Sequence, residues 1–498
     1  MRYPATALLA AFLALFWAAP CVIAGPLYQF DTPVVDSHLP LVSSPTIGQD
    51  VVMSTKSRYN IPDQASQLEG PARPPSPVMM SRRRCRPTES PTSPKCAVVQ
   101  VQLVARHGTR NPTSGNLKKH QALQKKFANY TAPSADFEFL SNFSLFCNTS
   151  FAGQLTAQGH FDHVQLAQRL KIRFPGPLSN ASLITWQATN VSRAIASAES
   201  FQTGLLSSSS EIARAQLEVR NSVLPVHLDA DLRAHDSCKN YSTALQVEEA
   251  LPDRPQDVFT AARYPAILAR LQSVLAFPTL TLDDVSQLFS LCSFEDTIRG
   301  KVAKGFCSLF TRDELTLADF AGDLEFWGER GYGFAPNEAI GCSLLTTLVS
   351  NIDAHVNGSA SIPAVMKFAH AETLGPLIAT LGLFRDTLSP NATDAQIASR
   401  AYRTAAFSPF AGNVLVELSS CADSTHQVRL LVDEVPVSIP GCGEQCELGA
   451  FKKLYADKIG CDFDGQICAN PRPTVGGAAT FRRKDSLTDA DATPSDDA

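Results

Sequence analysis

An apolar segment that runs straight into a cationic loop limits the possible folds of this chain more than any other feature. Residues 97–104 are largely apolar and β-branched, which is typical of a buried strand. Arg106-His107-Gly108-Thr109-Arg110-Asn111-Pro112 follows almost at once, and residues 116–130 have helical composition. A strand, a tight loop and a helix in this order place the loop at the carboxyl edge of an α/β sheet, where ligands bind.

The same pattern returns further along the chain. Residues 183–188 and 364–368 read as strands, and each precedes a segment of helical composition. Residues 413–418 and 428–432 read as a late hairpin across a turn around Asp423. Helical signals dominate residues 234–355. We therefore expect an α/β sheet domain with an inserted α-helical lobe.

Both ends of the chain differ in composition from its centre. Residues 1–24 resemble an export signal, with Arg2 before an apolar run that is short for a membrane span. Residues 25–92 are rich in Pro and Ser, which predicts a flexible leader, and residues 471–498 predict a disordered acidic tail. The folded domain is then expected over 93–470. No later run is long enough to cross a bilayer.

The basic triplet Arg82-Arg83-Arg84 lies within the predicted leader. It has two readings, a processing site or a solvated basic patch in a linker, and the sequence does not decide between them.

Cysteines and glycosylation sequons agree with export. The chain has 13 cysteines, one of which, Cys21, lies in the predicted signal. The other twelve lack the paired spacing of a zinc site, so they predict a disulfide framework in a secreted protein. We expect local pairing of Cys292 with Cys307 and a closure among the four cysteines from Cys442 to Cys468. N-glycans are expected at N-x-S/T sequons that begin at Asn129, Asn142, Asn148, Asn180, Asn190, Asn240, Asn357 and Asn391.

Charge excludes one broad class of partner. The formal net charge is -5, so no general basic excess exists to neutralise a nucleic-acid backbone. We expect no nucleic-acid partner. A phosphate-binding site in this chain must instead be a local cluster of cations.

The loop after the first strand carries the residue types that phosphoryl transfer needs. Arg106 and Arg110 can hold phosphate oxygens through paired N–H donors and stay charged at any working pH. His107 is a competent nucleophile toward phosphorus. Gly108 lets the backbone approach the phosphate closely. The loop therefore combines an attacking nitrogen with a cationic cradle.

Two other segments supply candidates that are weak signals alone. Arg193, after the second predicted strand, is a third candidate phosphate ligand. His370 and Glu372 follow the third strand in a His-Ala-Glu triplet, where His370 can donate to a phosphate oxygen and Glu372 can protonate the leaving group. Metal binding by this triplet is the rival reading. The spacing differs from the H-E-x-x-H helix pattern and no third ligand is evident, so we expect no metal and no cofactor.

Together, Arg-His-Gly-Thr-Arg-Asn-Pro-Thr and His-Ala-Glu-Thr resemble the histidine acid phosphatases, and within them the multiple inositol polyphosphate phosphatases. Stretches beginning at Leu232, Cys292, Arg330 and Pro409 are also similar. The resemblance implies a phosphoglycerate-mutase-like α/β domain with a helical lobe. It implies His107 as nucleophile, Arg106, Arg110, Arg193 and His370 as ligands of the scissile phosphate, and Glu372 as proton donor. Phytate or another inositol polyphosphate is the implied substrate.

Two departures and three alternatives qualify this resemblance. Asn111 stands where relatives often carry Tyr, and the chain does not end in an ER-retention tetrapeptide, which favours secretion. The alternatives are a broad-specificity acid phosphatase or phytase, a 2,3-bisphosphoglycerate phosphatase, and a catalytically silent phosphate-binding protein. Lysines on the helix after the loop are either ligands of further phosphates or simply solvated: Lys118, Lys119, Lys125 and Lys126.

Overall fold

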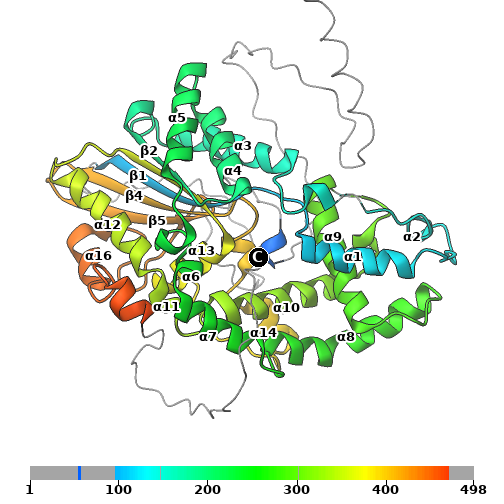
Figure 1. Cartoon of the computed structure of the whole chain (residues 1–498). Helices are drawn as coiled ribbons and strands as arrows, with labels where there is room; N and C mark the ends of the chain where they lie inside the picture. The colour runs from blue at the N-terminus through cyan, green and yellow to red at the C-terminus, as the bar shows by residue number, and fades with distance from the viewer. Residues whose placement is uncertain (1–53, 58–95, 146, 148, 301, 470–498) are drawn as a thin grey trace, which may run out of the picture.

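A computed structural model describes residues 54–57, 96–145, 147, 149–300 and 302–469 (Figure 1). The predicted export signal, the acidic tail, Cys85 and nearly all of the predicted leader lie outside these residues. The exception in the leader is a short 3-10 turn, η1 (Ser54–Lys56), which packs against helices of the folded domain.

A mixed sheet forms the centre of one half of the molecule. Its strands, within the described residues, are β1 (Cys96–Arg106), β2 (Ile184–Ala188), β3 (Ala364–Ala369), β4 (Asn413–Cys421), β5 (His426–Val432), β6 (Val435–Val437) and β7 (Cys446–Glu447). Their order is β2-β3-β1-β4-β5-β6, and β7 pairs with β5. β2, β3 and β1 run parallel, whereas β4 and β5 are antiparallel to their neighbours. The expected strands, including the late hairpin, are therefore present.

Helices cover both faces of this sheet (Figure 1). One face packs against α3 (Ala157–Arg173), α4 (Ser192–Leu205) and α5 (Ser209–Ser222), and Trp186 of β2 is fully buried there. The other face packs against α12 (Cys342–Val356), α13 (Ala371–Thr380) and α16 (Leu448–Leu454). Burial on both faces explains why β1 and β3 are predominantly apolar.

The remaining helices are α1 (Ser114–Lys126), α2 (Glu138–Ser141), α6 (Ala234–Ser237), α7 (Lys239–Glu249), α8 (Pro255–Val274), α9 (Leu282–Arg299), α10 (Arg312–Arg330), α11 (Asn337–Ile340), α14 (Asp394–Ser399) and α15 (Thr404–Phe407). Figure 1 shows α1, α2, α8, α9 and α10 grouped beside the sheet. Helices α6 to α12 lie in the sequence between β2 and β3. The expected α/β architecture with inserted helices is confirmed. No helix in the described part of the chain is long and apolar enough to span a membrane.

The described residues contain five disulfides, three of which join distant segments. The expected pair Cys292–Cys307 is present. The expected closure among the last four cysteines is only partly right, because Cys442 pairs with Cys446 while the other two pair elsewhere. These distant pairs are Cys238–Cys468, Cys342–Cys461 and, across β1 and β4, Cys96–Cys421.

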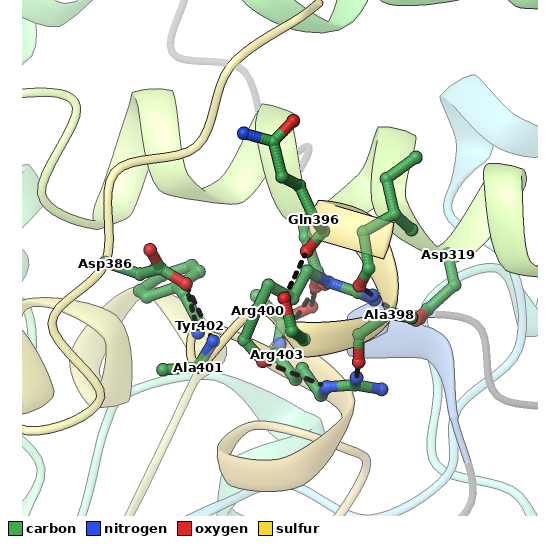
Figure 2. A network of polar contacts seen from close by, with 12 residues as sticks. Asp319, Asp386, Gln396, Ala398, Arg400, Ala401, Tyr402 and Arg403 are labelled. Carbon is green, nitrogen blue, oxygen red and sulfur yellow. Dashed lines mark hydrogen bonds and ion pairs between the residues drawn. The ribbon is translucent and has the colours of Figure 1, made fainter. Parts of the chain in front are cut away.

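Buried charges join α10 to the segment around α14 (Figure 2). The guanidinium of Arg400 donates to Asp319 and, at 2.6 Å, to Asp323. Asp323 also accepts hydrogen bonds from the amide and the hydroxyl of Thr404. This network connects the helical lobe to the chain that leads into β4.

Candidate active site

The cationic loop lies at the carboxyl end of β1, where three segments meet. Arg106 is the last residue of β1 and is paired in register with Ala369 of β3. The amide of His107 donates to the carbonyl of Ala369 at 3.0 Å, and its carbonyl accepts from the amide of Ala411 at 2.9 Å. Backbone hydrogen bonds on both sides therefore fix the position of His107.

The imidazole of His107 has a defined orientation. Its Nδ1 lies 2.9 Å from the carbonyl oxygen of Gly108. A carbonyl oxygen only accepts, so Nδ1 carries the proton and Nε2 keeps its lone pair. Burial, with the positive charges of Arg106 and Arg193, holds the pKa of His107 well below its usual value. These influences therefore favour the neutral, nucleophilic form of the ring.

An aromatic ring supports the residues of the loop. The guanidinium carbon of Arg106 lies 4.5 Å from the centre of the Phe410 ring, and that of Arg110 lies 6.0 Å away. The His107 ring centre is 5.9 Å from the same ring. Phe410 thus gathers two of the predicted phosphate ligands and the predicted nucleophile around one side chain.

Arg106 is buried without a carboxylate partner in ion-pair contact within the described residues. Its Nη1 donates to the carbonyls of Thr55 and, at 2.7 Å, of Ser408, while its Nε is buried and has no hydrogen-bond partner there. Burial, together with the charges of Arg110 and Arg193, lowers its pKa to about 9. The side chain remains charged at neutral pH but lacks an anion.

Gly108 is required by the packing of the loop against a helix. A Cβ atom at this position would overlap the backbone of Gly159 in α3. The missing side chain makes room for this helix, and the expected close approach of the backbone to phosphate stays a prediction. The amide of Gly108 donates to Ser197 Oγ at 3.0 Å, and that hydroxyl donates to the carbonyl of Arg193. Ser197 thus connects the loop to α4.

The segment 153–156, called the strap below, holds the far end of the loop. The carbonyl of Thr109 accepts from both the amide and the hydroxyl of Thr156, at 2.9 and 2.8 Å. Asn111 donates its amide to the carbonyl of Gln154 at 2.9 Å, and its side chain is buried. A Cβ added at Gly153 would lie 3.9 Å from Arg193 Nη1. The strap therefore brings Arg193 and the loop to the same region.

His370 and Glu372 come from the start of α13. The ring centres of His370 and His107 are 5.6 Å apart, which makes them neighbours. His370 Nε2 lies 2.9 Å from the hydroxyl of Thr189, whereas its Nδ1 is buried and has no partner within the described residues. Burial and Arg193 hold the pKa of His370 well below its usual value.

Glu372 lies among two imidazoles and a guanidinium group. Burial alone would raise the pKa of its carboxyl, but the influence of His370 and Arg330 outweighs this and holds the pKa at about 2. His235 acts in the same direction. The hydroxyl of Thr373 donates to the carbonyl of Leu232 at 2.6 Å, which ties α13 to the segment that carries His235.

All six predicted site residues therefore lie in one region, joined by the contacts and charges described above. Sequence reasoning assigned no role to Phe410, Arg330 or His235, although each lies in a stretch that resembled the family. It also missed η1, because its composition indicated only a leader. Of the helix lysines, Lys126 forms an ion pair with Asp284 at 2.6 Å, and Lys119 acts electrostatically on Lys56 of η1 and on His120 of α1.

The arrangement has the chemistry of an anion-binding nucleophilic site. Buried arginines surround a neutral imidazole, and a carboxyl group lies next to them. Among the described residues, no group of three or more His, Cys, Asp or Glu is placed to hold a metal ion. The cations that would bind an anion here are side chains of the chain itself.

Comparison with known proteins gives one family and many relatives. Residues 97–433 match the model of the histidine phosphatase superfamily (branch 2). Multiple inositol polyphosphate phosphatase 1 of Gallus gallus is 28% identical over 393 residues, covering 76% of this chain and 85% of the relative. Phytase A of Aspergillus awamori is 27% identical, covering 70% and 78%. Thiamine-repressible acid phosphatase pho4 of Schizosaccharomyces pombe is 26% identical, covering 72% and 81%.

Solved structures share the fold. The phytase from D. castellii superposes with a TM-score of 0.60 at 20% identity, covering 74% of this chain and 81% of that one. A multiple inositol polyphosphate phosphatase from Bifidobacterium longum, in complex with inositol hexasulfate, gives a TM-score of 0.59 at 20% identity, covering 82% and 99%.

Proposed function

Because the chain belongs to branch 2 of the histidine phosphatase superfamily and is a phosphomonoesterase of the histidine acid phosphatase type, we propose that inositol polyphosphates such as phytate are its substrates. The observation that carries the proposal is the orientation of His107 beside buried arginines. Cations beyond those that one phosphate needs support a substrate with several phosphates, since Arg330 and Arg233 also act on Glu372 and His370.

The proposed first step forms a covalent intermediate. Nε2 of His107 attacks phosphorus with its lone pair while the bond from phosphorus to the inositol oxygen breaks. Arg106, Arg110, Arg193 and His370 bind the oxygens of the transferred group and stabilise its charge. Glu372 gives a proton to the departing oxygen. The products are phosphohistidine and the inositol with one phosphate fewer.

In the proposed second step, water releases the phosphate. Glu372, now ionised, accepts a proton from water as its oxygen attacks phosphorus, and the bond to Nε2 breaks. Binding of the phosphate also matters for Glu372 itself. In the free protein its neighbours hold its pKa at about 2, and an anion that compensates their charge raises that pKa.

The test is phosphate release from phytate by the full chain, beside p-nitrophenyl phosphate and 2,3-bisphosphoglycerate, with EDTA present. We expect release from phytate that EDTA does not change and that His107→Ala reduces by at least about 10³-fold. An alkaline quench should trap labelled phosphate on the wild type and not on the variant. Equal trapping on both would refute His107 as nucleophile.

Other outcomes point to other functions. Release from p-nitrophenyl phosphate alone favours a broad-specificity acid phosphatase, as the similarity to the Schizosaccharomyces pombe enzyme suggests. Release mainly from 2,3-bisphosphoglycerate favours the corresponding phosphatase. Binding of inositol phosphate without any release favours a silent phosphate-binding protein.

We also propose that the protein is secreted and glycosylated. Five disulfides fit an extracellular protein. The sequon asparagines in the described part of the chain are all exposed: Asn129, Asn142, Asn180, Asn190, Asn240, Asn357 and Asn391. Asn240 differs because its Nδ2 donates to the carbonyl of Cys468 at 2.8 Å. A mass decrease on enzymatic removal of N-glycans from the secreted protein tests the proposal.

A further inference from the structure

The turn η1 brings a distant part of the chain to the active site. Residues 58–95 separate it from β1, yet Arg106 donates to the carbonyl of Thr55 and Phe410 donates its amide to the carbonyl of Ser57 at 3.2 Å. The turn contacts α9, α10 and α15, and Figure 1 shows it between the sheet and the grouped helices. These anchors are backbone carbonyls, so they hold the turn whatever side chain residue 56 carries.

Lys56 places one more cation beside the phosphate-binding arginines. Its side chain is half-buried, and its charge is within electrostatic reach of Arg106, Arg110 and Lys119. Lys56 and Lys119 also act together, after burial, to lower the pKa of His120 in α1 to about 4. The turn and α1 therefore carry positive charge toward the same region.

No group of the described residues compensates Lys56 by direct contact. Its ammonium makes no hydrogen bond and no ion pair there, and the exposed Glu325 of α10 acts on it only from a distance. Burial and the neighbouring cations lower its pKa, which means that the free protein holds this charge at a cost. A cation kept beside other cations is stabilised when an anion binds between them.

We propose that Lys56 binds a phosphate group of the substrate next to the one that is cleaved, with Lys119 as its partner across the site, and thereby favours polyphosphates over simple monoesters. This rests on the proposed function, in which Arg106 and Arg110 bind the cleaved phosphate. An ester with a single phosphate is held by those arginines and leaves Lys56 without a ligand. A lysine ammonium suits a neighbouring phosphate, because it is a compact charge that accepts many directions of approach.

The experiment compares Lys56→Met with wild type in the full chain. The kcat/KM for phytate relative to that for p-nitrophenyl phosphate should fall roughly ten-fold, as expected for one charge-assisted contact. Lys56→Arg should recover most of this selectivity. Lys453→Met, on the exposed surface of α16, removes the same charge and should leave the selectivity unchanged. Thermal unfolding verifies that the variants are folded.

A second measurement separates this proposal from the choice of substrate. Inositol hexasulfate should inhibit p-nitrophenyl phosphate hydrolysis roughly ten-fold less strongly in Lys56→Met, while inhibition by inorganic phosphate changes far less. This readout remains valid if the wild type does not cleave phytate. That result would contradict the proposed substrate but not the role of Lys56. If the wild type cleaves neither ester, calorimetric titration with inositol hexasulfate makes the same comparison.

Two results would overturn the role of Lys56. An equal loss on phytate and p-nitrophenyl phosphate would mean that Lys56 acts on the cleaved phosphate or on Arg106. Unchanged inhibition by inositol hexasulfate would mean that Lys56 meets no further anionic group.

Discussion

Two buried arginines in this molecule differ in what compensates their charge. Arg400 contacts two carboxylates, Asp319 and Asp323, in the network that joins α10 to the segment around α14 (Figure 2). Within the described residues, the guanidinium of Arg106 donates its hydrogen bonds only to the carbonyls of Thr55 and Ser408. Both side chains are almost completely buried. One arginine is therefore satisfied inside the protein, and the other is left for an external anion.

The free-energy cost of burying charge shows in different pKa values at the two arginines. Beside Arg400, burial and the charge of Asp319 raise the pKa of Asp323 to about 7, so the ionised form of a carboxyl group is the one that is disfavoured. At the active site, burial and other cations lower the pKa of Arg106 to about 9, so the charged form of the arginine is the one that is disfavoured. A buried cation without a carboxylate is thus a signature of a binding site rather than of a structural one.

Removing the charge of Arg106 should give the largest effect of this comparison. Arg106→Met is expected to lower kcat/KM for p-nitrophenyl phosphate roughly 10²- to 10³-fold, because the transferred group loses a charged donor. Its melting temperature should stay close to that of wild type, since the charge has no carboxylate in ion-pair contact among the described residues. Steady-state kinetics checks the expected loss of kcat/KM, and calorimetry checks the melting temperature. A large loss of stability with normal kinetics would reverse the assignment.

The same substitution at Arg400 should do the opposite. Arg400→Met leaves two buried carboxylates without their cation and is expected to reduce the free energy of unfolding by about 3–5 kcal/mol. The kcat/KM of the molecules that remain folded should be unchanged, because Arg400 lies outside the active site. Urea unfolding, with activity measured well below the transition, tests this. Unchanged stability would show that the network does not hold α10 in place.

A substitution of Glu372 distinguishes its proposed role as proton donor from its electrostatic effect on the arginines. Glu372→Gln keeps the size of the side chain but removes the proton, so hydrolysis of alkyl phosphates should slow by roughly 10²-fold. Hydrolysis of p-nitrophenyl phosphate should slow much less, since its leaving group needs no proton. Comparing kcat for the two ester types tests the role. An equal loss on both would leave Glu372 as an electrostatic neighbour of the arginines only.

The pH dependence should show the smallest effect. Because its pKa is held well below the usual value, His107 stays neutral, and kcat/KM should not fall as the pH decreases from 6 to 5. Glu372 is ionised in the free protein, so the proton for the leaving group must come from the substrate. The second pKa of the substrate's phosphate is roughly 6. Above that pH, kcat/KM should fall up to about ten-fold per pH unit. A pH profile on two esters measures both limits. An acid limb near 6.5 would mean an ordinary histidine.

The sequence by itself predicted the sheet and the candidate site residues. Apolar, β-branched runs predict β1, β2 and β3, because burial on both faces of a parallel sheet leaves little other choice. The loop with His107 and the triplet with Glu372 follow two of these strands directly. Since parallel strands end at one edge, the order of residues along the chain was enough to predict that they meet.

Only the tertiary structure decided which groups surround them. Thr55 contacts Arg106 from a segment that composition marks as a leader, and Arg400 differs from Arg106 because it pairs with carboxylates about eighty residues away in sequence. Gly108 is required by the backbone of Gly159, a contact between two elements. Contacts of this kind depend on how whole helices pack, and packing leaves no local pattern in the sequence.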